Sequence, residues 1–166
     1  MNIEIREMDK TLAPKAKALV FNVFKWMDIP EKMSFWVHKH QNNRLLKLFM
    51  RLIGGSAFSR YWVALDDRGE VCGTTGLYTE KSDENEALWL SWFCVDPRYR
   101  GAGIGKKLLE FSVDMAKSYD KKYLRLYTST DESEADAQFL YEKYEFKVVK
   151  TEELPAYTIV YRERAL

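Results

Sequence analysis

The apolar and polar positions of this chain follow two periods, and the change from one period to the other marks the elements. Short runs rich in β-branched and aromatic residues, several of them alternating with polar ones, predict strands. Longer runs with apolar side chains three and four positions apart predict helices. The predicted strands cover residues 3–6, 61–65, 71–78, 87–95, 123–128, 145–150 and 157–163. The predicted helices cover residues 12–27, 31–53, 104–119 and 133–144.

The order of these elements predicts the fold class. The polar connection at residues 66–70 joins two strands as a hairpin, with Gly69 placed for a positive φ. The helix at 104–119 lies between the strands at 87–95 and 123–128, which is the pattern of a βαβ crossover. We therefore expect an α+β (α/β) fold in the order βααβββαβαββ. It has a mixed, mostly antiparallel seven-stranded sheet with helices on both faces.

Length, composition and charge limit the classes of function. The 166 residues contain no repeat or flexible linker, so we expect a single domain over residues 1–166. The 26 Lys and Arg residues nearly balance 25 Asp and Glu residues, so the overall charge does not indicate a nucleic-acid partner. No apolar stretch approaches the ~20 residues that span a bilayer, and no signal peptide is evident. We expect a cytoplasmic protein with no membrane partner.

The two cysteines and two histidines give no indication of a metal site. Cys72 and Cys94 lie in apolar, strand-like runs, where cysteine usually behaves as a small buried hydrophobic residue. Neither belongs to a CxxC or Cys/His spacing typical of metal ligands. His38 and His40 are two positions apart and cannot share a helix face, so we interpret them as solvent-exposed. We expect no metal, and we expect Cys94 to be a structural thiol.

A glycine-rich turn between the strand at 87–95 and the helix at 104–119 indicates a binding site. The segment Arg100-Gly101-Ala102-Gly103-Ile104-Gly105 places alternate glycines directly before a helix N-terminus, and Lys106 follows at the rim. Backbone N–H groups without neighbouring Cβ atoms can approach an anion closely, and the helix N-terminus adds free donors and partial positive charge. The spacing fits neither the nucleotide P-loop GxxxxGK[ST] nor the dinucleotide fingerprint GxGxxG. The turn therefore predicts a pyrophosphate site whose ligand is open at this point.

Two segments resemble one known family. The run Cys94-Val95-Asp96-Pro97-Arg98-Tyr99-Arg100-Gly101-Ala102-Gly103-Ile104-Gly105 resembles the acyl-CoA signature of the GNAT superfamily of acyl-CoA-dependent N-acetyltransferases. The run Ala137-Gln138-Phe139-Leu140-Tyr141-Glu142-Lys143-Tyr144-Glu145-Phe146 resembles that family's later A-x-x-L-Y-E-x-x-G-F segment. The order of elements also matches along the whole chain. The resemblance implies a GNAT-like fold and an enzyme that moves an acetyl group from acetyl-CoA (coenzyme A) to a small-molecule or peptide amine.

The resemblance also implies roles for individual residues. The strand before the turn separates from its parallel neighbour, and the pantetheine arm of the cofactor binds to backbone groups of Phe93, Cys94 and Val95. The Val95 N–H polarises the thioester carbonyl. Tyr141 protonates the departing thiolate, because the reference pKa of a phenol, about 10, lies near that of a thiol leaving group. The pyrophosphate binds to amides of Arg100, Gly101, Ala102, Gly103, Ile104, Gly105 and Lys106.

The sequence departs from the family pattern at several positions. Glu145 stands where the family has Gly, and Glu134 stands where the family often has a cofactor-binding Asn, so that role is not transferred. The usual position of a general base holds Trp89, and Glu84 and Glu86 near the start of that strand are the remaining carboxylates. A non-catalytic acyl-CoA-binding module of the same fold is therefore an alternative. A nucleotide-binding protein is a third hypothesis.

The acceptor is expected to bind over the first two helices and the last strands. That region is rich in aromatic and apolar side chains, which would suit an apolar or weakly anionic amine. The same residues would equally suit a hydrophobic core or a homodimer interface. They are Trp26, Met27, Phe35, Trp36, Phe49, Phe58, Pro155 and Tyr157.

Overall fold

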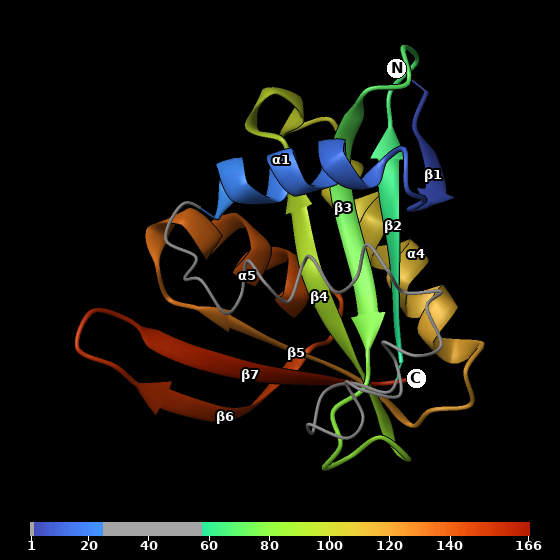
Figure 1. Cartoon of the computed structure of the whole chain (residues 1–166). Coiled ribbons are helices and arrows are strands. Elements are labelled where there is room, and N and C mark those ends of the chain that lie inside the picture. The colour runs from blue at the N-terminus through green and yellow to red at the C-terminus, as the bar shows by residue number, and fades with distance from the viewer. Residues whose placement is uncertain (1, 25–57) are drawn as a thin grey trace.

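A seven-stranded sheet forms the centre of the molecule in the computed structural model, which describes residues 2–24 and 58–166 (Figure 1). The strand order is β1-β2-β3-β4-β5-β7-β6, and every neighbouring pair is antiparallel except β4 and β5. The mixed, mostly antiparallel sheet predicted from the sequence is thus confirmed. The strands are β1 (Glu4–Glu7), β2 (Ser59–Leu65), β3 (Val71–Tyr78), β4 (Ala87–Val95), β5 (Tyr123–Ser129), β6 (Lys147–Glu153) and β7 (Thr158–Ala165).

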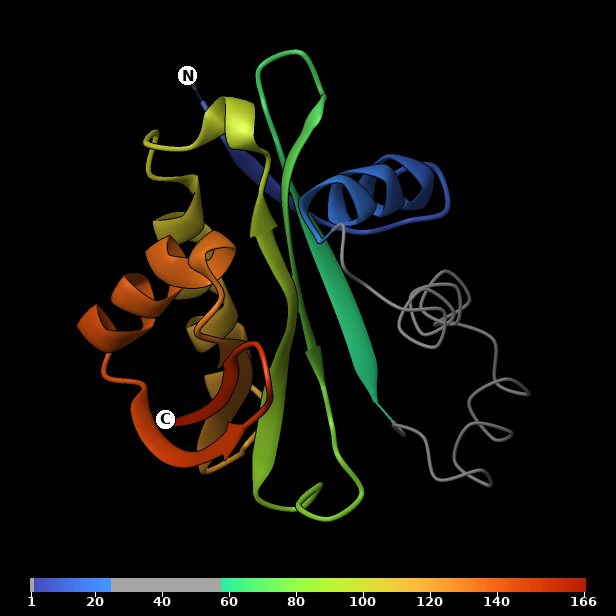
Figure 2. The same ribbon diagram turned by 90° about the vertical axis from the view of Figure 1, so that its left-hand side faces the viewer.

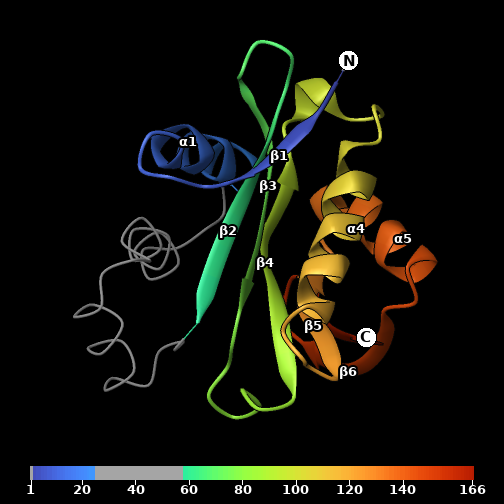
Figure 3. The ribbon, with the colours of Figure 1, turned by 90° about the vertical axis from the view of Figure 1, so that its right-hand side faces the viewer.

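Helices cover both faces of this sheet. Helix α1 (Ala13–Val23) lies on one face, while α4 (Ile104–Lys117) and α5 (Ala135–Lys143) lie on the other (Figures 2 and 3). Two short 3-10 helices, η1 (Pro97–Tyr99) and η2 (Glu132–Glu134), precede α4 and α5. Within the described ranges, no helix has the length and apolar character needed to cross a membrane.

The apolar positions of the helices form the two halves of the core. Ala16 and Val20 of α1 are fully buried against one face of the sheet. Leu108, Leu109 and Ala116 of α4 are fully buried against the other face. Ala16 and Val20 are four positions apart, and Leu109 and Ala116 are seven apart, which is the helical spacing that predicted both helices. Burial of such a stripe excludes water from apolar surface and fixes each helix on the sheet.

Strands β4 and β5 separate soon after they meet. Their parallel pairing joins only Ala87–Trp89 of β4 to Tyr123–Arg125 of β5. Beyond Trp89 the two strands diverge, and β5, β7 and β6 fan away from the rest of the sheet (Figure 1). The second half of β4 therefore has a backbone edge that pairs with no strand among the described residues. This divergence matches the expectation that the resemblance gave for this strand.

Most predicted elements are confirmed, and the differences lie at their ends. Strands β3 and β4 have the predicted bounds, whereas α4 ends two residues earlier and α5 begins as the turn η2. Strand β6 begins at Lys147 rather than at residue 145, because Glu145 adopts a left-handed φ of 61°. The predicted helix at 31–53 and the end of the helix at 12–27 lie outside the described residues. His38, His40, Trp26, Met27, Phe35, Trp36 and Phe49 also lie there.

The turn at Glu145 closes helix α5 with a Schellman motif. The Phe146 N–H donates to the Tyr141 carbonyl at 3.0 Å, and the Glu145 N–H donates to the Glu142 carbonyl at 3.0 Å. The rings of Phe146 and Tyr141 pack edge to face with centroids 5.8 Å apart, which supplies the hydrophobic contact of this motif. Glu145 thus occupies the left-handed position that glycine favours, and the turn keeps its form without glycine.

Candidate active site

The glycine turn adopts a conformation that only glycine takes without strain. Gly101 has a φ of 77° and Gly103 a φ of 78°, both in the left-handed region. Apart from its chain neighbours, a Cβ atom built on either residue would have no atom of the described residues within 4 Å, so the turn borders open space there. Gly103 is the N-cap residue of α4, and its carbonyl accepts the first helical hydrogen bond, from the Lys107 N–H. Among the described residues, the first amides of α4 therefore have no backbone acceptor and can bind an anion.

The turn is held to the sheet by the residues that precede it. The Asp96 carboxylate accepts hydrogen bonds from the Arg98 N–H at 2.9 Å and from the Arg98 guanidinium at 2.7 Å. These contacts hold the pKa of Asp96 below its usual value, so the group stays ionised. The Tyr99 hydroxyl donates to Asp66 at 2.8 Å and thereby joins η1 to the β2–β3 hairpin. The segment that leads into the turn is thus fixed to the β2–β3 hairpin.

The remaining sequence-predicted residues of the turn fall into two groups. Arg100, Ala102 and Lys106 are on the outer side of the turn, and the Lys106 ammonium lies 3.9 Å from the Glu110 carboxylate. Ile104 is fully buried under α4, so only its backbone amide can contact a ligand. The side chains therefore add a cationic rim, while the anion-binding groups are backbone amides.

The turn, the end of β4 and Tyr141 meet at one place. A Cβ atom on Gly105 would lie 3.7 Å from both Val95 and Leu140, and 3.9 Å from Phe93. The rings of Phe93 and Tyr141 have centroids 5.8 Å apart. Phe93 and Tyr141 are more than forty positions apart in the sequence and yet are neighbours in the fold. A shared site for the glycine turn and the Tyr141 segment requires such proximity.

The open edge of β4 presents the Val95 amide. The Asp96 N–H donates to the Cys72 carbonyl of β3 at 2.9 Å. Because successive residues of a strand direct their N–H groups to opposite edges, the Val95 N–H points away from β3. That edge faces β5, which no longer pairs with β4 at this point. Val95 therefore offers a backbone donor to the space between the diverging strands.

Tyr141 combines burial with a free hydroxyl. The residue is 5% exposed on helix α5, and within the described part of the chain its hydroxyl has no hydrogen-bond partner. Burial raises the pKa of this hydroxyl far above its ordinary value, and the nearby Glu134 carboxylate acts in the same direction. The phenol is therefore protonated at every physiological pH. A buried polar group without a partner is costly and rare in proteins, and a catalytic role is one explanation for such a group.

Cys94 is a structural thiol, as the sequence predicts. It is 6% exposed, and burial raises its pKa to about 12. Burial likewise raises the pKa of Cys72 to about 11. Because the thiolate is the reactive form, neither cysteine is suited to nucleophilic attack.

A buried polar network that the sequence did not reveal holds α5 in place. The Arg162 guanidinium of β7 is 7% exposed and donates to Gln138 at 2.9 Å, to Glu142 at 2.9 Å and to the Phe146 carbonyl at 3.1 Å. Gln138 in turn donates to the Ser129 carbonyl of β5 at 2.7 Å. These contacts fix the helix on both sides of Tyr141. An arginine in an alternating strand gives no sequence signal that it is buried.

Glu134 also has a structural role at the start of α5. Its carboxylate accepts hydrogen bonds from the Thr128 hydroxyl, from the Ser129 N–H at 3.1 Å and from the Ser129 hydroxyl at 3.1 Å. It therefore joins the end of β5 to the helix that carries Tyr141. This role could not be predicted from the sequence, because the cofactor-binding amide that the family often has at this position is absent here.

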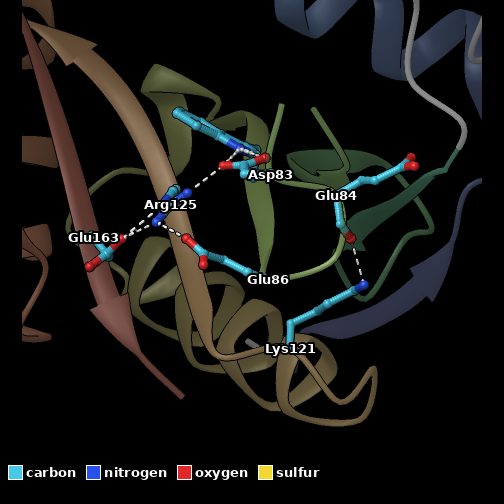
Figure 4. Close-up of polar contacts among 7 residues, drawn as sticks. Asp83, Glu84, Glu86, Lys121, Arg125 and Glu163 are labelled. Atoms are coloured by element: carbon cyan, nitrogen blue, oxygen red, sulfur yellow. Dashed lines mark hydrogen bonds and ion pairs between the residues drawn. The ribbon is translucent and has the colours of Figure 1, made fainter. Parts of the chain in front are cut away.

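Two of the carboxylates near the start of β4, those of Asp83 and Glu86, are engaged in a cluster of ion pairs, whereas Glu84 contributes only its backbone carbonyl, to Lys121 (Figure 4). The Arg125 guanidinium, 20% exposed, binds the carboxylates of Asp83, Glu86 and Glu163, the last two at 2.7 Å. The Trp89 indole N–H donates to Asp83 at 3.0 Å. Glu86 is thus tied to Arg125 and is not a free general base. Arg125 pairs with Trp89 at the last position where β4 and β5 are joined, so the cluster lies at the point from which the two strands diverge.

Comparison with known proteins decides the family. A family model described as the acetyltransferase (GNAT) domain matches residues 57–148, more than half of the chain. The chain belongs to the GNAT acetyltransferase family. This GNAT chain is also 34% identical over 90 residues to a spermine/spermidine N(1)-acetyltransferase of Bacillus subtilis. That alignment covers 51% of the chain and 58% of the relative, so the chain spans little more than half of the relative's length.

Solved structures agree with the GNAT fold over the full chain. An acetyltransferase of the GNAT family from Staphylococcus aureus Mu50 superposes with a TM-score of 0.70 at 20% identity, covering 99% of both chains. The PaiA N-acetyltransferase of Thermoplasma acidophilum, solved in complex with coenzyme A, superposes with a TM-score of 0.69 at 20% identity. That match covers 100% of both chains. At such identities the likeness concerns the fold.

Proposed function

We propose that this protein transfers an acetyl group from acetyl-CoA to an amine by direct attack of the amine on the thioester. The observation that carries the proposal is the buried Tyr141 hydroxyl, unpartnered among the described residues, which lies against Phe93 beside the point where β4 and the glycine turn meet. A protonated phenol at this position supplies the proton that a departing thiolate requires. Family membership and the free edge of β4 support the same activity.

The residues present fit coenzyme A. The left-handed glycines border open space, and the first amides of α4 offer N–H donors to a pyrophosphate. The backbone of Phe93, Cys94 and Val95 at the unpaired edge of β4 suits an extended arm with amide groups. When bound, acetyl-CoA supplies an activated thioester. Arg100 and Lys106 add positive charge at the mouth of the turn, which favours phosphate groups.

Each group of the chain then has one task in the proposed reaction. The Val95 N–H donates to the oxygen on which negative charge develops as the amine nitrogen bonds to the acetyl carbon. When the carbon–sulfur bond breaks, Tyr141 donates its proton to the sulfur. The amine loses its own proton to water, because Glu86 is bound to Arg125 and Trp89 occupies the position of a base, while Glu84 is the carboxylate left to accept that proton through water. Tyr141 then regains a proton from water. No covalent intermediate with the protein forms, in agreement with the high thiol pKa values.

Polyamines are the first acceptors to test. The proposal of this class rests on the Bacillus subtilis relative, whose name gives spermine and spermidine as its substrates. A polyamine has several primary and secondary amino groups, any of which meets the chemical requirement for attack on a thioester. Aminoglycosides, amino acids and peptides with a free N-terminus form the rest of the panel.

The non-catalytic acyl-CoA-binding module is the second candidate. The engagement of Glu86 by Arg125, and the Trp89 side chain at the usual position of the base, favour it. The two candidates make different predictions in one experiment. An enzyme releases free CoA thiol with at least one amine of the panel, whereas the module binds acetyl-CoA saturably and releases none.

Gly103→Val is the variant that tests the cofactor site, and Gly69→Val is its matched control. Both glycines have a left-handed φ, 78° and 75°, and among residues 2–24 and 58–166 a Cβ on either would meet no atom within 4 Å beyond its chain neighbours. The backbone strain of the two substitutions is therefore similar. Only Gly103 lies at the proposed phosphate site. We expect Gly103→Val to abolish CoA binding in calorimetry and thiol release, and Gly69→Val to retain both. Equal affinity in the two variants would place the phosphate site elsewhere.

A further inference from the structure

Strand β4 contains a strained residue shortly before the proposed donor amide. Trp92 has a φ of 48°, in the left-handed region that a bulky side chain rarely adopts. The strain lies at a bulge, because Thr74 pairs with Cys94 while Gly76 pairs with Ser91. Two residues of β4 therefore oppose a single residue of β3. Such a conformation persists only when the surrounding structure holds it.

The Thr74 side chain provides a buried contact to the backbone of this bulge. Its hydroxyl donates to the Trp92 carbonyl at 2.6 Å, and its oxygen lies 3.2 Å from the Cys94 sulfur. Thr74 is 3% exposed, so water does not compete for this hydrogen bond. The rings of Trp92 and Phe24 pack edge to face with centroids 6.2 Å apart, and this contact holds the Trp92 side chain. The carbonyl and the ring of the strained residue are thus both fixed.

The bulge determines which amide of β4 faces the open edge. After the bulge, Gly73 pairs with Val95, and the Asp96 N–H donates to Cys72. If the register of Gly76 and Ser91 continued without the bulge, Gly73 would pair with Cys94 instead. A shift of one residue exchanges the two edges and the two faces of a strand. The Val95 N–H would then point toward β3, and its side chain would leave the α4 face.

We infer that Thr74 is a positioning residue for the proposed acetyl transfer. Its hydroxyl holds the Trp92 carbonyl and thereby the bulge, and the bulge directs the Val95 N–H at the position of the developing charge. The inference rests on the proposed function. Thr74 itself touches no reacting atom, so its effect is expected on the rate of transfer and not on the binding of the phosphates.

Thr74→Val and Thr74→Ser form the test, since valine keeps the shape without the hydroxyl and serine keeps the hydroxyl. We expect Thr74→Val to lower kcat about tenfold or more, because a displaced oxyanion donor typically costs that much. The Kd of ADP, which carries the pyrophosphate but not the arm that would bind along β4, should stay within about twofold, since the glycine turn is intact. Thr74→Ser should restore most of kcat. Thr74→Ala is a second variant without the hydroxyl if the valine variant does not fold.

Backbone NMR of the same variants gives a readout that does not depend on turnover. We expect the amide signals of Trp92 to Val95 to move in Thr74→Val and Thr74→Ala, and to keep their wild-type positions in Thr74→Ser. Unchanged amide signals in the hydroxyl-free variants, or a serine variant as slow as the valine variant, would overturn the inference. Absence of thiol release by the wild-type protein with every amine would instead refute the proposed function, while the NMR result would still decide whether Thr74 holds the bulge.

Discussion

Removal of the Tyr141 hydroxyl should make the protein more stable and less active at the same time. Tyr141→Phe deletes one oxygen atom from a residue that is 5% exposed. The ring contacts with Phe93 and Phe146, at centroid distances of 5.8 Å, remain. Within the described residues no partner loses a hydrogen bond, so the variant avoids the cost of burying an unsatisfied hydroxyl. Stability and activity should therefore change in opposite directions.

The expected magnitudes follow from this geometry. A buried polar group without a partner costs about 1–3 kcal/mol, so we expect a gain of about 1 kcal/mol in the free energy of unfolding. For a domain of this size that gain raises Tm by about 2–4 °C. Loss of a general acid lowers the rate of transfer by about 10²–10⁴-fold. CoA affinity should not change, since the backbone amides of the glycine turn are untouched.

Tyr144→Phe is the control at the end of the same helix. The Tyr144 hydroxyl donates to the Glu110 carboxylate at 2.6 Å, so its removal should cost about 1 kcal/mol and leave the rate unchanged. The measurements are urea unfolding at neutral pH and release of CoA thiol at saturating acetyl-CoA and amine. A Tyr141→Phe protein that loses stability would show that the hydroxyl has a partner. One that keeps the wild-type rate would show that the proton comes from another group.

Three further predictions concern stability. Glu145→Gly should raise the free energy of unfolding, measured by urea titration, by about 0.5–1 kcal/mol, because glycine takes the φ of 61° without strain. Glu145→Ala, which keeps a Cβ atom, should not raise it. Gly76→Ala should cost about 2 kcal/mol or more, because its Cβ would lie 2.3 Å from the Tyr61 ring; wild-type stability would refute this close packing. The pKa of Asp96 is lowered from its usual 3.8 by hydrogen bonds from Arg98, so the unfolded chain takes up the proton first as the pH falls. The stabilisation from Asp96 is therefore present above pH ~4 and lost below it. Between about pH 5 and 2, the free energy of unfolding of Asp96→Asn should depend less on pH than that of the wild type. An equal pH dependence of the two proteins would contradict the lowered pKa.

Local sequence predicted much of the candidate site because its chemistry depends on local backbone geometry. The glycine turn requires left-handed φ angles at Gly101 and Gly103, and glycine is the residue that adopts them without strain. The periods of the apolar residues predicted β3, β4 and α4 because each of these elements buries apolar side chains. Where a non-glycine residue takes a left-handed φ, as Glu145 does, local preference is overridden, and the predicted start of β6 was wrong by two residues.

Contacts between distant segments could not be predicted in the same way. Thr74 and Arg162 look like ordinary strand residues, and their roles depend on partners 18 and 24 positions away, the Trp92 carbonyl and Gln138. The engagement of Glu86 by Arg125 is equally invisible in the sequence, although it removes a candidate base. Such contacts follow from strand order and register, which depend on the packing of the whole sheet.

The sequence by itself determined that a helix begins among three alternating glycines, since only backbone preference is needed to place N–H donors there. It also determined that Tyr141 lies on a helix. Only the tertiary structure decided that Tyr141 meets Phe93 beside that turn, that its hydroxyl is buried and unpartnered within the described residues, and that β4 leaves β5 after Trp89. The physical reason is that burial, and with it the pKa of a phenol, is a property of what surrounds a group in space and not of its neighbours along the chain.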